Sequence, residues 1–517
     1  MTVSRLARAA TVVAIFGLVS RFLGLLRNVA LAGFYGTSGE ADAFVNGLLI
    51  VNVGAAVLLY LLVTVVIPLF QSERADHGDD SAWRLVWAIA GWVGIVTIAV
   101  GSLIAVWPEA AAATFRLDPE RAELTTELIR IMAPALLFQG ISALFTALLQ
   151  IHGRFGIPAA VGMAFNAGTI GGIMIGHATI GIHGAAWGVT AGALMQVLLQ
   201  LPQFFRVMGA HRAQVRLGHP RLGRASMLAL PVAAASVIQQ VNNWTDKFFA
   251  SSLEAGRVAA LDYANSLGSA PRTALLVPFL TPLFPLVARL MAQGRTAEAA
   301  RGVQRVTGLL GLVAVPTGAL IAVYAHETAQ LTLGRGTCDA SCVTETSKPL
   351  FWYAVALLLN FLTIFLNRVL AADNRQRDVL LATVASVVVT IAFDAILIGP
   401  MEQAGLALAS AIGVGVNLLI YIGYLRHRLP EFSTAALARQ QARLVACGGA
   451  TIVVALLLNG LWDTSAVTGG ALVWPLAAKV AAGLAAFLAV ATVLARAELR
   501  EARGAVAALV RRGPRVA

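Results

Sequence analysis

The sequence contains fourteen apolar runs that are long enough to cross a lipid bilayer, and this series limits what the chain can fold into. A membrane-spanning helix needs about 20 consecutive residues that are predominantly apolar. These runs predict an all-α polytopic membrane protein with 14 transmembrane helices. The runs lie at residues 9–35, 42–70, 85–107, 124–150, 157–179, 184–206, 226–252, 257–290, 303–324, 349–370, 379–398, 403–425, 441–461 and 471–495.

The composition excludes a soluble protein and argues against a nucleic-acid partner. Of the 517 residues, 58% are hydrophobic and only 12% are charged, and the mean hydropathy is +0.78, which is typical of membrane proteins. The net charge of +12 comes almost wholly from arginine. Because the arginines cluster in short loops between the apolar runs, they indicate membrane orientation and not nucleic-acid binding.

The loops alternate between arginine-rich and arginine-poor, and this alternation predicts the topology. Cytoplasmic loops carry an excess of Lys and Arg, so both termini are expected in the cytoplasm. The first apolar run is not followed by a small-residue cleavage site and then a soluble domain, which favours a retained first helix over a removed signal. The arginine-rich set comprises Arg74 and Arg84; Arg154; Arg206, Arg212, Arg216, Arg221 and Arg224; Arg289, Arg295, Arg301 and Arg305; Arg368, Arg375 and Arg377; Arg426, Arg428 and Arg439; and the tail from Arg496 to Arg515.

An internal echo predicts a duplicated architecture. A shift of 221 residues places Gly184–Gly192 over Gly405–Gly413. An even number of crossings per repeat gives parallel halves related by an axis along the membrane normal. We therefore predict two six-helix lobes in a parallel pseudo-two-fold repeat plus two C-terminal helices. The corresponding domains are 1–225, 226–430, 431–495 for the last two helices, and 496–517 for a basic cytoplasmic tail that is either amphipathic or disordered.

Two arginines interrupt the first apolar run, within the segment Ser20–Asn28. An uncompensated cation at membrane depth costs several kcal/mol, so it usually faces protein or a wet cavity. Arg21 and Arg27 are separated by about 9 Å of helical rise and about 120° of rotation. Guanidinium groups in such a cavity suit a phosphate or diphosphate, which they bind bidentately. The alternative is that both arginines pair with Glu40, Asp42 or backbone carbonyls and only hold helices together.

Two carboxylates also lie at membrane depth. Asp246 falls in the seventh run and Asp394 in the eleventh, and such residues are candidates for binding a coupling cation, Na⁺ or H⁺, with Ser410 adding an oxygen. The alternative is that Asp246 pairs with Lys247 or Arg272, and that Asp394 only hydrogen-bonds a neighbouring helix.

The three cysteines form no metal-ligand set. Cys447 lies in an apolar run, where packing explains it. Cys338 and Cys342 share a polar loop that the topology places outside the cytoplasm. The oxidising exterior permits a disulfide there, and the short spacing leaves open whether one forms.

Three groups of residues recur together in one known family. They are Ser20–Asn28 with Ala41–Phe44, then Leu149–Pro158, then Asp246–Leu253 with Gly256 and Tyr263–Ala264. In order and spacing these segments resemble the MurJ/MviN family of lipid II flippases, within the multidrug/oligosaccharidyl-lipid/polysaccharide exporter superfamily. The resemblance covers essentially the whole chain, and fourteen spans is that family's number.

The resemblance implies a transporter and not an enzyme. It implies a central cavity between two lobes, in which arginines hold the diphosphate of lipid II, an undecaprenyl-linked peptidoglycan precursor. Lipid II would be flipped from the inner to the outer leaflet of the bacterial cytoplasmic membrane by alternating access. The substrate-binding residues implied by position are Arg21, Arg27 and Asp42, with Ser20 and Asn28 beside them.

The resemblance also implies a coupling ion and a set of partners. A sodium site described for the family corresponds to Asp246, Asp394, Ser410 and Thr390, where Thr390 replaces a usual asparagine. No other cofactor is expected. The implied partners are lipid II and the membrane lipids, and cell-wall synthesis proteins are left open as further partners.

The chain departs from the family pattern in two spans. Asn52–Val57, which includes Ala55, stands where the second span usually carries an arginine pair. In the eighth span, Ser266 and Ser269 replace an arginine and a glutamate. Arg272 lies roughly 240° around the helix from the lost arginine, which makes it a poor replacement. These departures weaken the assignment of lipid II and leave open another polyprenyl-linked glycan.

Three other functions remain as alternatives. A cation-coupled drug antiporter is disfavoured because such relatives usually have twelve spans. A polyprenyl-dependent glycosyltransferase would place Glu40 and Asp42 in its first external loop, but no external loop here is long enough for an acceptor domain. A non-transporting scaffold that has lost its cavity charges would function unchanged after replacement of Arg27.

Overall fold

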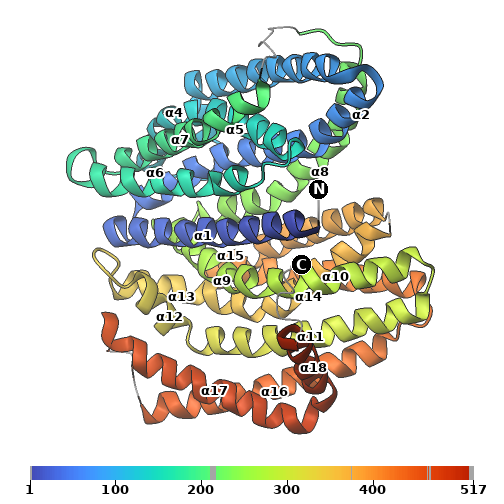
Figure 1. The fold of residues 1–517 in the computed structure, drawn as a ribbon. Coiled ribbons are helices and arrows are strands. Elements are labelled where there is room, and N and C mark those ends of the chain that lie inside the picture. The colour runs from blue at the N-terminus through green and yellow to red at the C-terminus, as the bar shows by residue number, and fades with distance from the viewer. Residues whose placement is uncertain are drawn as a thin grey trace. The chain divides into compact units, whose positions relative to one another are not determined.

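The computed structural model describes residues 3–209, 217–373, 375–462, 464, 467 and 469–511 (Figure 1). Every regular element in these ranges is helical, which confirms the predicted all-α class. Arg212 and Arg216 of the arginine-rich loops, and residues 512–517 of the predicted tail, lie outside the described residues.

The described residues form two compact units, residues 1–259 with 336–338 and residues 260–335 with 339–517. The first unit contains α1 (Val3–Tyr35), α2 (Gly39–Val106), α3 (Pro108–Ala112), α4 (Pro119–Met132), α5 (Pro134–Ile151), α6 (Gly156–Ile180), α7 (His183–Met208) and α8 (Leu222–Ala250). Helix α9 (Arg257–Pro271) begins at the end of this unit.

The second unit continues with a π-helical turn (Arg272–Leu276) and then runs through helices to the C-terminus. These helices are α10 (Val277–Ala292), α11 (Thr296–Val323), α12 (Ala325–Leu333), α13 (Ala340–Val355), α14 (Leu357–Ala372), α15 (Gln376–Arg428), α16 (Thr434–Leu461), α17 (Val473–Leu494) and α18 (Arg496–Arg511), with a short 3₁₀ turn (Gly469–Leu472) before α17.

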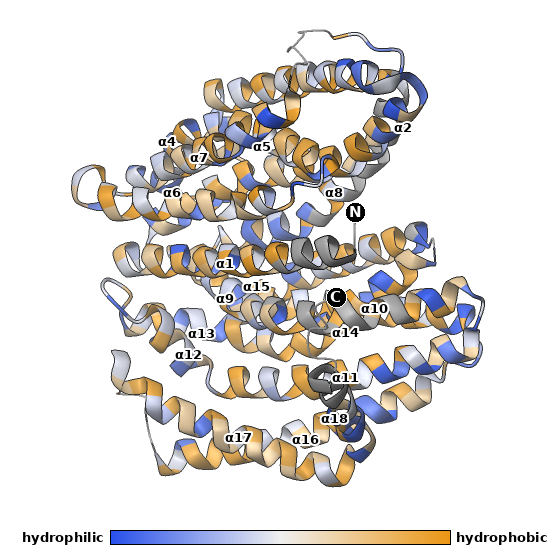
Figure 2. Ribbon diagram, viewed as in Figure 1, coloured by the Kyte–Doolittle hydropathy of each residue, from blue (hydrophilic) through white to orange (hydrophobic). Residues whose placement is uncertain are grey.

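The long helices have the apolar composition of membrane spans, as Figure 2 shows along most of their length. Nine of the described helices are long and apolar enough to cross a membrane, or ten if the bent pair α13–α14 counts as one span. Two of the nine contain two predicted spans each. Helix α2 breaks at Gly78 (φ 79°) and α15 breaks at Glu402 (φ 50°). The number fourteen stays a prediction.

Prolines account for two places where one predicted span is divided. The predicted span 124–150 is split into α4 and α5, and Pro134 is the first residue of α5. The predicted span 257–290 is split at Pro271 into α9, the π-helical turn and α10. Proline has no N–H to donate to the preceding turn, so a helix ends or rearranges there.

The 221-residue echo recurs in the packing of each unit. Helix pairs pack closely through glycines, which is the small-residue packing typical of membrane helices. A Cβ at Gly184, Gly192 or Gly405 would collide with the neighbouring backbone, and a Cβ at Gly413 would collide with the Thr390 side chain and lie 3.2 Å from the Ser386 carbonyl oxygen. Each contact in the second unit lies 221 residues after its counterpart in the first. The contacts are Gly184 with Gly176 and Gly192 with Phe165 in the first unit, and Gly405 with Leu397 and Gly413 with Ser386 in the second.

The first compact unit extends past residue 225 because α8 packs against it. Trp244 of α8 stacks on Phe115 with ring centroids 5.8 Å apart, and it also packs beside Leu49 and Ile50 of α2. The compact unit is defined by packing, whereas the predicted lobe boundary at 225/226 is defined by the internal repeat and stays a prediction.

Residues 496–511 of the predicted tail form the helix α18, which packs on the second unit. The Glu498 side chain is buried and accepts a hydrogen bond from Gln440 Nε2 at 3.1 Å. Glu501 lies 3.4 Å from Arg305 Nε. The described part of the tail is therefore ordered against α11 and α16.

Candidate functional site

The arginine-bearing part of α1 is attached to α6. Asn166 Nδ2 donates a hydrogen bond to the carbonyl oxygen of Ser20 at 3.1 Å. A Cβ at Gly162 would collide with the Ser20 hydroxyl, so the two helices approach closely at this point. Gly24 lies against the same Asn166 side chain. Ser20 thus serves as a packing contact in this structure, and its predicted contact with substrate stays a prediction.

The two predicted anion-binding arginines have different surroundings. Arg21 is exposed, and none of the described acidic residues forms an ion pair with it. Arg27 is half-buried, and its Nε and Nη2 donate to Asn28 Oδ1 at 3.2 and 3.0 Å. Asn28 itself is only 1% exposed. Asn28 therefore orients the Arg27 guanidinium, which suits a fork that binds an anion in a fixed direction.

The Asp42 carboxylate is bound by the protein itself. Its Oδ2 accepts the backbone N–H of Gly256 and its Oδ1 accepts the backbone N–H of Ala259, each at 2.7 Å. Arg121 Nη1 lies 3.4 Å from Oδ2, and Asp42 is 0% exposed. Gly256 has φ +90° and a Cβ there would collide with the Thr37 backbone, so glycine fits this turn. The role of Asp42 in substrate binding stays a prediction.

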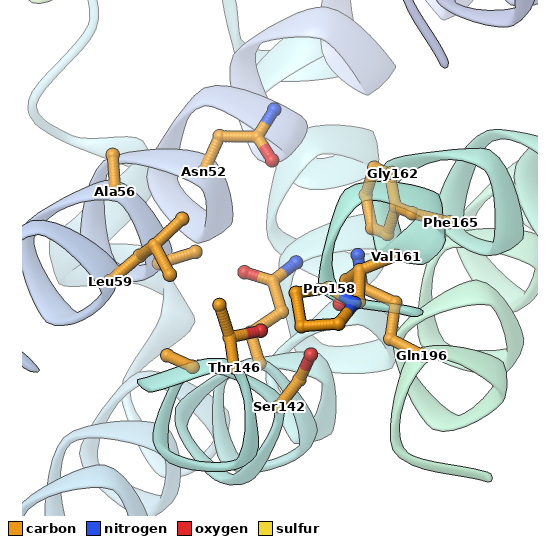
Figure 3. Close-up of a pocket in the computed structure, with 13 residues that line it drawn as sticks. Asn52, Ala56, Leu59, Ser142, Thr146, Pro158, Val161, Gly162, Phe165 and Gln196 are labelled. Carbon is orange, nitrogen blue, oxygen red and sulfur yellow. The ribbon is translucent and has the colours of Figure 1, made fainter. Parts of the chain in front are cut away.

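A cavity of about 410 Å³ lies in the first unit, between helices α2, α5, α6 and α7 (Figure 3). Three of these helices each contribute residues at positions i, i+3, i+4 and i+7, the spacing of one helix face. The lining contains no charged residue and no histidine. It consists of Asn52, Ala55, Ala56 and Leu59 from α2; Gln139, Ser142, Ala143 and Thr146 from α5; Pro158, Val161, Gly162 and Phe165 from α6; and Gln196 from α7.

Buried hydrogen bonds behind the cavity hold its polar wall in place. Gln200 Nε2 donates to Ser142 Oγ at 2.7 Å, and Thr146 Oγ1 donates to Gln200 Oε1 at 3.1 Å. Gln139 is 7% exposed, and its Oε1 has no hydrogen-bond partner among the described residues. The wall therefore includes a residue with a buried acceptor that the described residues do not satisfy.

The predicted cation ligands fall in both compact units. In the second unit, Thr390 and Asp394 lie one turn apart on the first half of α15, and they are 1% and 0% exposed. Gly413, one turn after Ser410 on the second half, packs against Thr390. Asp246 belongs to the first unit, on α8, and is 9% exposed. Among the described residues no three His, Cys, Asp or Glu side chains come together as a metal site. The sodium site stays a prediction.

The eighth-span departures lie on α9 in the second unit. Ser269 Oγ donates to the carbonyl oxygen of Ser266 at 3.1 Å, within its own helix. A Cβ at Gly268 would come 2.8 Å from Tyr353 Cβ, so this face packs against α13. Arg272, in the π-helical turn, donates to Asn360 Oδ1 at 3.4 Å.

Of the cavity residues, the sequence marked Asn52, Ala55 and Ala56 only as a departure from the family pattern, and it marked neither the other cavity residues nor Arg121 as site candidates. The signal available for the cavity was Asn52, Gln139 and Gln196, three uncharged amides within apolar helices. An amide in an apolar helix is a weaker indication of a functional site than a charge, because such amides often only form hydrogen bonds between helices. Arg121 looked like a loop arginine, because nothing local in the sequence places it beside a residue 79 positions away.

Cys338 and Cys342 are disulfide-bonded in the structure, which settles the question that their spacing left open. Cys447 is free and buried, as expected for a packing residue.

The chain is similar to curated flippases over most of its length. It is 25% identical to "Lipid II flippase MurJ" of Burkholderia cenocepacia over 473 residues, which cover 88% of this chain and 90% of that protein. It is 24% identical to "Probable lipid II flippase MurJ" of Bdellovibrio bacteriovorus over 452 residues, covering 84% and 85%.

Solved structures show the same fold at lower identity. A structure of "Lipid II flippase MurJ, inward closed conformation" superposes with a TM-score of 0.80 at 18% identity, covering 94% of this chain and 99% of that chain. An inward-facing multidrug resistance MATE family transporter of the MOP superfamily gives a TM-score of 0.67 at 14% identity, covering 82% and 99%. The family described as "Lipid II flippase MurJ" matches residues 60–474. The chain therefore belongs to the lipid II flippase MurJ family.

Proposed function

We propose that this protein flips lipid II, a polyprenyl-diphosphate-linked peptidoglycan precursor, from the inner to the outer leaflet of the bacterial cytoplasmic membrane by alternating access. It acts as a transporter, and no enzymatic step is required. Family membership supports the substrate class, and the arginine distribution supports a cytoplasmic location of both termini. The observation that carries the proposal is the arginine pair on α1, where Arg21 is exposed within an apolar helix and Arg27 is oriented by Asn28.

The arginines supply what a diphosphate needs at membrane depth. A guanidinium at the centre of a membrane helix costs about 2.5–3.5 kcal/mol on insertion scales. An anionic headgroup offsets this cost, because a phosphate accepts two parallel N–H bonds from one guanidinium. Arg27 already has its orientation fixed by Asn28, so less conformational entropy is lost when the phosphate binds. Replacement of Arg27 by lysine keeps the positive charge but removes the forked pair of N–H donors that binds a phosphate bidentately.

Cation coupling forms a second part of the proposal. Asp394 and Thr390 are buried on one face of α15, and a buried carboxylate at membrane depth requires a counter-charge or a proton. We propose that a coupling cation, Na⁺ or H⁺, binds at Asp394, Thr390 and Ser410 of the second unit during transport, and that Asp246 of the first unit is a separate candidate ligand. The expected result is that Asp394→Asn lowers flipping without lowering lipid II binding.

The test is complementation in a bacterium depleted of its own lipid II flippase. Wild type is expected to restore growth, whereas Arg21→Ala and Arg27→Ala fail and Arg27→Lys restores growth only partly. Arg74→Ala is the matched control, since Arg74 pairs with Asp79 on an exposed part of the same unit and contributes little. All variants are compared at equal membrane abundance.

The reverse results have definite meanings. A well-inserted wild type that fails to restore growth contradicts lipid II transport and favours export of another lipid-linked oligosaccharide. The departures at Ala55, Ser266 and Ser269 favour that second candidate, because each lacks a charge that the family usually carries. Full growth with Arg27→Ala favours a scaffold that does not transport.

A further inference from the structure

We propose that the uncharged cavity between α2, α5, α6 and α7 binds the sugar part of the lipid-linked substrate, while the phosphates bind elsewhere. This inference rests on the proposed function, because it assigns one portion of the same substrate. It concerns a site that contains Asn52, Gln139, Ser142, Thr146, Phe165 and Gln196.

The size of the cavity fits a ligand group. Its volume of about 410 Å³ lies within the range of about 300–1,000 Å³ that ligand pockets occupy. Small residues in the wall contribute to this volume, since α2 presents Ala55 and Ala56 beside Asn52 and Leu59, and α6 presents Gly162.

The polar groups of the wall determine the chemistry of the occupant. Because Ser142 Oγ accepts from Gln200, its own O–H remains available to donate into the cavity. Because Thr146 donates its O–H to Gln200, its oxygen lone pairs remain available to accept. Gln139 Oε1 adds a buried acceptor that the described residues leave unsatisfied. The wall therefore offers donors and acceptors together.

This combination excludes two portions of the substrate as occupants. A phosphate has only acceptor oxygens and negative charge, and the lining offers it no cation. A polyprenyl chain would leave the Ser142 O–H and the Thr146 lone pairs without a partner, which costs about 1–3 kcal/mol for a buried polar group. Sugar hydroxyl and N-acetyl groups both donate and accept hydrogen bonds, and they satisfy such a wall without a charge.

The cavity and the arginine segment share a helix. Gly162 lines the cavity and also marks the close contact with Ser20, the residue before Arg21. Asn166, one turn further along α6, holds the Ser20 carbonyl. The structure therefore attaches the proposed anion-binding segment to the helix that forms one wall of the proposed sugar site, as a substrate with adjoining phosphate and sugar requires.

The test compares two soluble probes on the purified full-length protein. One probe is a lipid II analogue with a short prenyl chain and no peptide, and the other is the same short-chain prenyl diphosphate without sugar. Wild type is expected to bind the lipid II analogue more tightly. The double variant Gln139→Leu, Gln196→Leu is expected to lose about 5- to 50-fold in affinity for that analogue, the loss of two or three hydrogen bonds. Its affinity for the sugarless probe stays within about twofold of wild type.

Two further variants keep the result interpretable. Ala56→Leu adds bulk on the cavity wall without removing a polar group, and it is expected to produce the same selective loss. Gln203→Leu is the matched control, because Gln203 is on α7 and also has a buried Oε1 without a described partner, but it does not line the cavity. It is expected to bind both probes as wild type does.

Each other outcome contradicts a defined statement. Unchanged affinity of the cavity variants for the lipid II analogue shows that the cavity holds only water, and overturns this inference while the proposed function stands. An equal loss of affinity for both probes shows either that the cavity binds the phosphates or that the substitutions disrupt the fold, and it also overturns this inference. If wild type binds neither probe, the proposed function fails, and this inference fails with it.

Discussion

The Asp42 carboxylate accepts two backbone N–H groups and lies beside Arg121 in a site closed to solvent. Such charge-assisted hydrogen bonds stabilise a fold, and removing one leaves a buried donor unsatisfied. Asp42→Asn is therefore expected to lower the free energy of unfolding by roughly 1–3 kcal/mol, measured as a lower thermal unfolding midpoint of the purified protein.

Asp118→Asn is the matched control for Asp42. Its side chain is 48% exposed and contacts the same Arg121. Hydrogen bonds from Arg121, the backbone N–H foremost, lower the pKa of Asp118, but Asn caps a helix about as well as Asp. Equal thermal midpoints for both variants would contradict a structural role for Asp42 and would favour the predicted role in substrate binding.

His219 provides a pH-dependent contribution outside the membrane spans. Burial is the main cause that lowers its pKa below the usual value of 6.5, and its ring Nδ1 lies 3.2 Å from the backbone N–H of Arg221, which it accepts. The unfolded chain therefore binds more protons near pH 6, so stability from neutral His219 is present above pH of about 6.5 and is lost as the pH falls through the folded pKa. Its charged surroundings are Glu73, which raises its pKa, and Arg84, Arg221 and His77, which lower it.

The variant His219→Gln isolates this contribution. Glutamine does not titrate, so the thermal midpoint of the variant is expected to fall less than that of wild type between pH 7.5 and pH 5.5. The comparison cancels the carboxylates that titrate in both proteins. Parallel pH profiles for the two proteins would show that His219 contributes nothing to the acid sensitivity.

At the scale of helices, the contact between α6 and α7 depends on glycines that leave no room for a side chain between the two backbones. A Cβ at Gly172 would collide with Gly184 and Gly188, whereas a Cβ at Gly171 meets nothing within 4 Å. Gly172→Ala is therefore expected to lower stability by about 1–3 kcal/mol through overpacking. Gly171→Ala is expected to be neutral or stabilising by up to about 1 kcal/mol, because alanine favours helix more than glycine does.

Thermal unfolding of these adjacent variants tests the packing directly. The neighbouring contact of Gly184 with Gly176 recurs at the 221-residue shift as Gly405 with Leu397, so Gly405→Ala is expected to destabilise the second unit in the same way. Similar midpoints for Gly171→Ala and Gly172→Ala would mean that the helices separate easily at this face, and would contradict the close contact.

At the scale of the whole molecule, the sequence predicted features that depend on local pattern. Apolar runs have a length set by the bilayer, so the all-α class and most long helices followed from the residues alone. The glycine echo also followed, because close packing requires small residues at fixed spacing. Arg21 and Arg27 stood out as candidates because a charge within an apolar helix is costly, and their role in binding substrate stays a prediction.

Features that depend on distant contacts were not predictable in this way. The Asp42 site joins residues 214 and 217 positions apart, and the cavity combines four helices between Asn52 and Gln196. The division of α13 from α14 by a 47° bend has no proline at the break. Such contacts are set by how side chains of separate helices pack, which the apolar period of a single helix does not encode.

The orientation of the chain in the membrane can be tested with single cysteines and a thiol reagent that does not cross the membrane. The native background is low, since Cys338 and Cys342 are disulfide-bonded and Cys447 is buried. The predicted topology places the α6–α7 connection and the loop at residues 325–348 outside. Thr179 and Lys348 are exposed there, so Thr179→Cys and Lys348→Cys are expected to label in intact cells. Asp80→Cys, beside the α2 break, and His427→Cys, at the end of α15, are expected to label only after the membrane is opened. Each pair includes one position from each compact unit. If only one member of a pair were labelled on the opposite side, the chain would cross the membrane an odd number of times between the two positions, which would contradict the fourteen-span topology. Reversal of all four positions would place both termini outside.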